Sequence, residues 1–175
     1  MDRRQLLAGG AAVASFLPAA RALTAQETNQ PVEGGMAAGA MDEAKMPALE
    51  GGMFLMQSSQ LAEQKGESDN VRAFAALEVA EQQAIAAAFG AEGAQIPLRE
   101  DHAEIMAQLE AAEGQEFDMA YLQAQITAHE EARGVHENYA QSGQDPMARG
   151  ASMVGVPSID SHLVMLRSFE QQMQG

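Results

Sequence analysis

Residues 117–136 read FDMAYLQAQITAHEEARGVH, and this stretch decides the fold class of the chain. At about 100° per residue, its apolar residues fall on one face of an α-helix. Asp118, Gln125, His129 and His136 line up beside that face. The pattern predicts an amphipathic helix that packs against other helices through one side. We expect His129 to face the interior and His136 to lie at the rim or on the surface.

The chain after Pro47 shares this helical pattern. Ala, Glu, Gln, Leu and Met dominate, β-branched residues are few, and no alternating strand pattern occurs. A short helical piece is expected from Asp145-Pro146 to Gly150, and Pro157 suits the first turn of a helix. The longer helices are expected over 50–65, 69–89, 98–113, 116–141 and 157–173. The predicted fold is all-α, a four-helix-bundle-like domain with an extra short helix, spanning residues 48–175.

The first 22 residues have the pattern of an export signal peptide. A basic start with Arg3 and Arg4 precedes an apolar run, and Ala20-Arg21-Ala22 fits the small-x-small rule for cleavage after Ala22. The two arginines followed by Gln5-Leu6-Leu7 resemble a twin-arginine signal, and an ordinary secretory signal is the alternative. The apolar run is shorter than the roughly 20 residues of a membrane-spanning helix. We therefore expect a periplasmic protein whose mature form has no transmembrane anchor.

The composition limits the partners of the chain. Ten Lys and Arg stand against 25 Asp and Glu, the formal net charge is −15, and cysteine is absent. So acidic a chain repels nucleic acid, and without cysteine neither disulfides nor thiol chemistry are possible. The partners that remain are an envelope protein or further copies of this chain.

Residues 23–47 form an expected disordered leader, rich in Met, Gly and Ala and without a regular apolar period. Met36, Met41 and Met46 recur in it at intervals of five, and Met53 and Met56 follow. Thioether sulfur suits Cu(I), so one interpretation is a copper-binding segment. The other is that methionine is a flexible filler in an Ala- and Met-rich composition.

Several polar residues fall inside the predicted apolar stripes. Glu78 and Gln82 share the stripe of their helix, His162 lies in the middle of another, and His102 lies in a third. Together with His129, these residues would meet inside the bundle, where a buried carboxylate needs a partner.

Three interpretations of this interior polar set are open. In the first, a hydrogen-bonded network holds the helices together and a histidine proton neutralises Glu78. In the second, His129, His162 and Glu78 form a mononuclear site for zinc, copper or iron. The third is general acid–base catalysis by a histidine beside a buried carboxylate.

Motifs of known enzymes are missing. Di-iron bundles use Glu-x-x-His, but the residues three before the four histidines are Arg99, Ile126, Arg133 and Ile159. The zinc-protease motif His-Glu-x-x-His fails because Arg133 occupies the place of the second histidine. A phosphate-binding glycine loop and a nucleophile elbow are also missing. We therefore expect neither a di-iron centre nor an enzyme.

Three segments resemble one protein family. VRAFA at 71–75, FDMAYLQAQITAHEE at 117–131 and VPSIDSHL at 156–163 are similar to the bacterial domain of unknown function 4142. The resemblance covers roughly residues 50–172. It implies an exported, ferritin-like helical bundle without an established activity, with family histidines at His129 and His162.

This chain departs from the family pattern at two places. Glu81-Gln82 stands where the family commonly has Asp-His, and Leu55 stands where an acidic residue is frequent. A metal site of the family would have lost ligands here, although Glu78, one turn from Gln82, could substitute.

We therefore expect an exported helical bundle with a non-catalytic binding role or a role in envelope stress. The alternatives are a bundle that binds a single transition metal ion through its internal His and Glu residues, and a structural or protein-interaction module.

Overall fold

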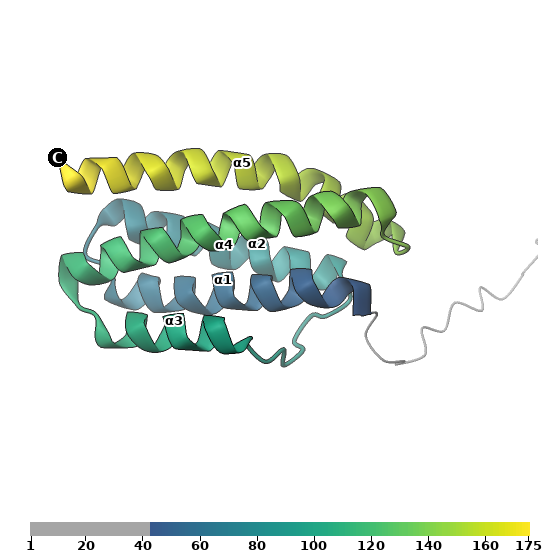
Figure 1. The fold of residues 1–175 in the computed structure, drawn as a ribbon, viewed down its shortest axis with the longest axis horizontal. Helices are drawn as coiled ribbons and strands as arrows, with labels where there is room; N and C mark the ends of the chain where they lie inside the picture. Colours follow the sequence, from purple (N-terminus) through teal and green to yellow (C-terminus); the bar gives the residue numbers. More distant parts are fainter. Residues whose placement is uncertain (1–42) are drawn as a thin grey trace, which may run out of the picture. The chain divides into compact units, whose positions relative to one another are not determined.

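The computed structural model describes residues 43–175, which form an all-α bundle (Figure 1). The expected signal peptide and leader residues 23–42 lie outside the described residues. A 3-10 turn, Glu43–Lys45, leads into five α-helices: α1 (Met46–Lys65), α2 (Asp69–Ala88), α3 (Glu100–Ala111), α4 (Gly114–Ser142) and α5 (Pro146–Gln174). Over this part of the chain there are no strands, which confirms the predicted fold class. Within the same range, none of the helices is long and apolar enough to cross a membrane.

Two helical hairpins make up the bundle. α1 and α2 form the first hairpin, and α4 and α5 form the second. In cross-section α1 contacts α2 and α4, and α5 contacts α4 and α2. Residues 89–113 cross from one end of the bundle to the other, so α2 and α4 run in the same direction (Figure 1). Such a single long crossover is the topology of ferritin-like bundles, and α3 lies within it against α1 and α4.

The core combines clusters of apolar side chains with buried polar contacts. Phe74, Phe117 and Tyr121 are essentially fully buried and belong to one cluster of apolar side chains. Asp118, also buried, accepts hydrogen bonds from the backbone N–H groups of Glu67 and Ser68 at 3.2 and 2.8 Å. This carboxylate therefore fastens the turn between α1 and α2 to the start of α4.

The first helix begins earlier than the sequence pattern predicts. α1 starts at Met46 with Pro47 in its first turn, and the turn before it is anchored by Lys45. The Lys45 ammonium donates to Asp145 at 2.7 Å and to the Phe89 carbonyl at 3.0 Å. The last residues of the expected leader therefore belong to the helical domain.

The predicted short piece at residues 146–150 and the predicted helix 157–173 are one continuous helix, α5, so the predicted break between them is wrong. The Asp145 side chain caps the start by accepting from the N–H groups of Met147 and Ala148. Pro157 lies inside the helix, where it removes one backbone hydrogen bond. The buried face of α5 continues on both sides of Pro157, and this packing offsets the lost hydrogen bond. The buried residues before the proline are Ala148, Ser152 and Gly155.

Candidate functional site

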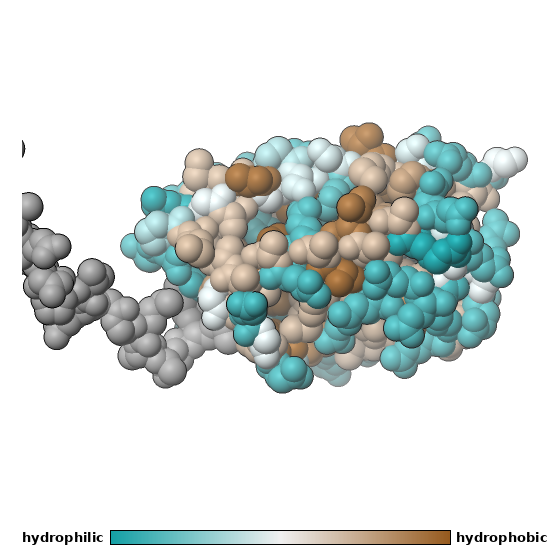
Figure 2. Space-filling view, turned by 180° about the vertical axis from the view of Figure 1, so that it is seen from behind, coloured by the Kyte–Doolittle hydropathy of each residue, from teal (hydrophilic) through white to brown (hydrophobic). Residues whose placement is uncertain are grey.

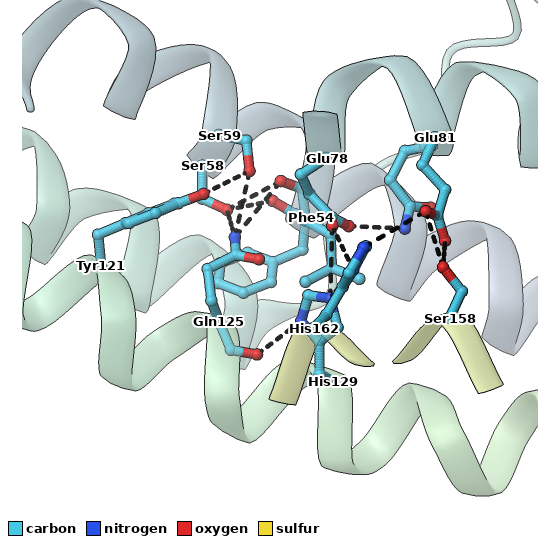
Figure 3. Close-up of polar contacts among 12 residues, drawn as sticks. Phe54, Ser58, Ser59, Glu78, Glu81, Tyr121, Gln125, His129, Ser158 and His162 are labelled. Carbon is cyan, nitrogen blue, oxygen red and sulfur yellow. Dashed lines mark hydrogen bonds and ion pairs between the residues drawn. The ribbon is translucent and has the colours of Figure 1, made fainter. Parts of the chain in front are cut away.

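Three donor atoms from three helices converge in the interior of the bundle (Figure 3). Glu78 comes from α2, His129 from α4 and His162 from α5. Glu78 Oε2 lies 3.1 Å from His162 Nδ1 and 3.4 Å from His129 Nε2, and the two nitrogens are 3.1 Å apart. Glu78 and His129 are 0% and 1% exposed, and the His162 side chain is 11% exposed. The site is therefore a small, nearly dry triangle of one oxygen and two nitrogens.

The neighbours of the two rings decide which nitrogens carry protons. His129 Nδ1 lies 2.8 Å from the Gln125 backbone carbonyl, which can only accept, so this nitrogen carries the proton. His162 Nε2 faces a carboxylate oxygen of Glu81 at 3.5 Å, which favours a proton on that nitrogen. In neutral rings with these tautomers, His129 Nε2 and His162 Nδ1 both present lone pairs to the Glu78 carboxylate. Such a cluster of three acceptors requires a cation between them or an additional proton on one ring.

Glu78 itself is only half satisfied by hydrogen bonds. Its Oε1 accepts from the Gln82 amide at 2.8 Å. Its Oε2 has no hydrogen bond of good geometry in the described part of the chain, although it lies at ion-pair distance from both histidines. The two imidazole nitrogens also lie at hydrogen-bond distance from each other, so all three atoms lie around one small space.

The electrostatics of the site couple Glu78 to the two rings. Burial alone would raise the pKa of Glu78, but hydrogen bonds and charge from His129 and His162 outweigh it and lower that pKa to about 2. Burial acts to lower the pKa of His162, whereas Glu78 and Glu81 raise it, and the raising effect prevails. In the absence of a metal ion, Glu78 is thus a carboxylate that holds a proton on a neighbouring imidazole.

Apolar and polar groups enclose the triangle on its other sides. The ring of Phe74 lies 5.2 Å from the ring of His162 and 6.0 Å from that of His129, centroid to centroid. The Gln125 side chain donates to Ser58 at 2.9 Å, and its own buried oxygen has no hydrogen-bond partner among the described residues. These groups keep water away from the donors and hold His129 in one orientation.

The structure brings together four of the five interior polar residues that the sequence singled out: Glu78, Gln82, His129 and His162. The fifth, His102, is buried elsewhere. It stacks on Phe54 with ring centroids 4.3 Å apart, and its Nε2 lies 2.9 Å from the Arg99 guanidinium.

The predicted surface position of His136 is wrong, because this residue is only 4% exposed. Its Nδ1 lies 3.1 Å from the Ser152 hydroxyl, and its ring packs edge-on against Phe89. The cause is the continuity of α5: Ser152 and Gly155 lie in residues 151–156, which the sequence pattern did not predict as helical, and they cover His136.

Two functional neighbours were not assigned from the sequence. Gln125 lies four residues before His129 on the same helical line, which is the signal that could have identified its carbonyl as the partner of that ring. Glu81 lies three residues after Glu78, but its contact with His162 depends on how α5 is rotated against α2. Ser158 holds the Glu81 carboxylate by donating to its two oxygens at 2.9 and 3.0 Å.

Comparison with protein families gives one match. The model of the family described as Domain of unknown function (DUF4142) matches residues 25–169, and the chain belongs to this family. Neither a comparison with curated proteins nor one with solved structures gives a significant match. The matched range includes all three residues of the donor triangle.

Proposed function

Because membership of a domain of unknown function assigns no activity, we propose from the site itself that this chain is a non-catalytic module that binds one divalent transition metal ion. The ligands are Glu78, His129 and His162. The observation that carries the proposal is the convergence of three lone-pair atoms, 3.1 to 3.4 Å apart, beside a Gln125 carbonyl and a Glu81 carboxylate that favour the required tautomers. The proposal includes export to the periplasm by the signal at residues 1–22.

The donor triangle supports a class of metal rather than one element. Two imidazoles and a carboxylate are ligands that suit zinc, copper and iron. With metal–ligand bonds of about 2.1 Å, neighbouring ligands lie about 3.4 Å apart in a tetrahedral site and about 3.0 Å apart in an octahedral one. The observed separations of 3.1, 3.1 and 3.4 Å lie between these limits. Either geometry leaves at least one position for a water molecule.

Burial of the donors favours binding over turnover. A catalytic metal needs an open position that a substrate can reach. Here Glu78 and His129 are essentially inaccessible, and Phe74 lies against both rings. A metal ion with a water ligand fits such a site, whereas a substrate does not, so we place the chain among proteins that store, buffer or carry a metal or use it to hold their fold.

Metal analysis of the mature chain (residues 23–175), purified without chelator, tests the proposal. We expect close to one equivalent of a first-row transition metal, and its loss in the His129→Ala/His162→Ala double variant. Glu78→Gln keeps the shape of the side chain and should weaken binding by at least tenfold. His102→Ala is the matched control, because His102 is equally buried but lies outside the triangle. A wild-type protein that contains no metal and takes up no added Zn²⁺, Co²⁺ or Cu²⁺ would refute the proposal.

A second candidate function, a protein-interaction module, is favoured by the apolar surface of α2 and α5. The face seen from behind carries a band of apolar atoms amid hydrophilic ones (Figure 2). Large apolar side chains are strongly exposed on these two helices: Leu77, Met147, Met153, Val154 and Val164, each 59% exposed or more. Exposed apolar patches mark interaction sites in soluble proteins. Light scattering of the metal-free and metal-loaded protein would show whether copies of the chain associate, and Val154→Glu should abolish such association.

A further inference from the structure

Glu81 links the donor triangle to the protein surface. Its carboxylate contacts His162 on one side at 3.5 Å and is 28% exposed on the other. His162 is in turn the only one of the three donors with appreciable exposure, at 11% of its side chain. A row of polar groups therefore runs from solvent through Glu81 and His162 to Glu78 (Figure 3).

A hollow of about 310 Å³ lies on the solvent side of Glu81, in the groove between α2 and α5. Small residues, among them Ala84 and Gly155, leave this space between the helices, and the strongly exposed Val154 stands at its rim. Glu81 supplies the only charge among the residues that line it, with Ser158 beside it. A cation that enters the hollow therefore meets one carboxylate.

We propose that Glu81 and Ser158 form an outer cation station through which the metal ion enters and leaves the inner site, with His162 as the ligand that moves aside. This inference rests on the proposed metal-binding function. The ion is first held by the Glu81 carboxylate. Rotation of the His162 side chain then opens the way to Glu78 and His129, and His162 returns to complete the ligand set. Nε2 of His162 keeps its proton while Nδ1 coordinates, and the additional proton that one ring holds in the metal-free site passes to solvent as the metal ion binds.

On the α1 side, the hollow that Gly52 and Gln82 line is much smaller, with a volume of about 20 Å³. The Gln82 amide is bonded to Glu78, and its oxygen lies only 2.6 Å from the place where a Cβ on Gly52 would be, so α1 and Gln82 are in close contact. Phe74 and the Gln125 backbone close two further directions. The formal charge of −15 attracts cations to the whole chain. Glu81 is the carboxylate next to His162 where an attracted cation can bind first.

The test measures rates as well as affinity. Metal-free wild-type, Glu81→Gln and Glu104→Gln proteins are mixed with Co²⁺ in a stopped-flow instrument, and release is followed after addition of excess chelator. Glu104→Gln makes the same change of charge at an exposed carboxylate of α3, away from the hollow. We expect Glu81→Gln to slow uptake by about tenfold or more at unchanged Co²⁺ stoichiometry, and the loss of the ion pair with His162 should weaken the inner site as well. Glu104→Gln should match the wild type.

Two results would overturn the outer station. One is uptake by Glu81→Gln at the rate of the Glu104→Gln control. The other is faster release with unchanged uptake, which would make Glu81 solely a positioning residue for His162. Ser158→Ala frees the Glu81 carboxylate but keeps its charge, so it should slow uptake by a smaller factor than Glu81→Gln does. If circular dichroism shows that Glu81→Gln is unfolded, the uptake rate of Ser158→Ala is compared with that of Glu104→Gln instead. An equilibrium titration comes first: a wild-type protein that binds no Co²⁺ would refute the metal-binding function itself.

Discussion

Gly52→Ala should damage the candidate site without touching any of its donor atoms. A Cβ at residue 52 would lie 2.6 Å from the Gln82 side-chain oxygen, closer than real Cβ atoms come to other atoms. Gln82 would have to move, and its amide now donates to the buried Glu78 carboxylate at 2.8 Å. The substitution therefore acts on Glu78 through Gln82.

The magnitude follows from two opposing contributions. A hydrogen bond to a buried charged group contributes about 1.5–3 kcal/mol. Replacing glycine by alanine inside a helix stabilises it by about 0.5–1 kcal/mol. Gly52→Ala should therefore lower the free energy of unfolding by about 0.5–2.5 kcal/mol. Gly51→Ala is an ideal control, because a Cβ there meets nothing within 4 Å, and it should raise stability by about 0.5–1 kcal/mol.

Urea denaturation of the metal-free proteins measures both effects. The difference between the two alanine variants cancels the helix contribution and reports the disturbance of Gln82 alone, about 1.5–3 kcal/mol. In a Gln82→Ala background the clash is gone, so Gly52→Ala should become as favourable as Gly51→Ala. Equal stability of the two single variants would refute the coupling between Gly52 and Glu78.

Three further predictions concern pH and buried polar groups. In the metal-free protein, Glu78 contributes stability above pH 4.5, and this stability is lost as the pH falls toward 2. His162 contributes stability below pH 6.5, and this stability is lost as the pH rises through its raised pKa. The urea concentration at the midpoint of unfolding should therefore be highest between pH 4.5 and pH 6.5. His136→Ala should lower the free energy of unfolding by about 2–4 kcal/mol, because it leaves a cavity and an unpaired buried Ser152 hydroxyl. Glu137→Ala, at the exposed neighbouring residue, should change it by about 0.5 kcal/mol or less. Urea denaturation measures both. Lys45→Met should lower the unfolding free energy by about 1–3 kcal/mol and raise amide hydrogen exchange at the start of α1, because two hydrogen bonds of the ammonium are lost.

The fold class and most of the helices follow from periodicity alone. The helices predicted at 69–89 and 116–141 agree with α2 and α4 to within two residues at each end. Their apolar stripes also placed Glu78 and His129 on inward-facing positions, because the rotation of a side chain about a helix axis depends only on its number in the sequence. The meeting of His129 with His162 followed from the same reasoning applied to a third helix.

The sequence predictions fail where packing between helices determines the extent of a helix or the surroundings of a side chain. Gly150 and Pro157 predict the end of one helix and the start of the next, yet α5 continues through both because it packs against the bundle. The same missed continuity explains the wrong position of His136, because the residues that cover it lie in 151–156, which were not predicted as helical. Glu81 could not be assigned for a related reason: its distance to His162 depends on the relative rotation of two helices, which no single-helix pattern contains.

The origin of the donors would allow a bound metal ion to report on correct folding. Glu78 belongs to the first hairpin, and His129 and His162 belong to the second, so neither half of the chain holds a complete set. An ion bound there would act as a removable cross-link between the hairpins, a task that disulfides perform in chains that contain cysteine, which this one lacks. Metal occupancy would then report that the two halves have docked correctly, and a nicked or misassembled chain would release its ion before it unfolds.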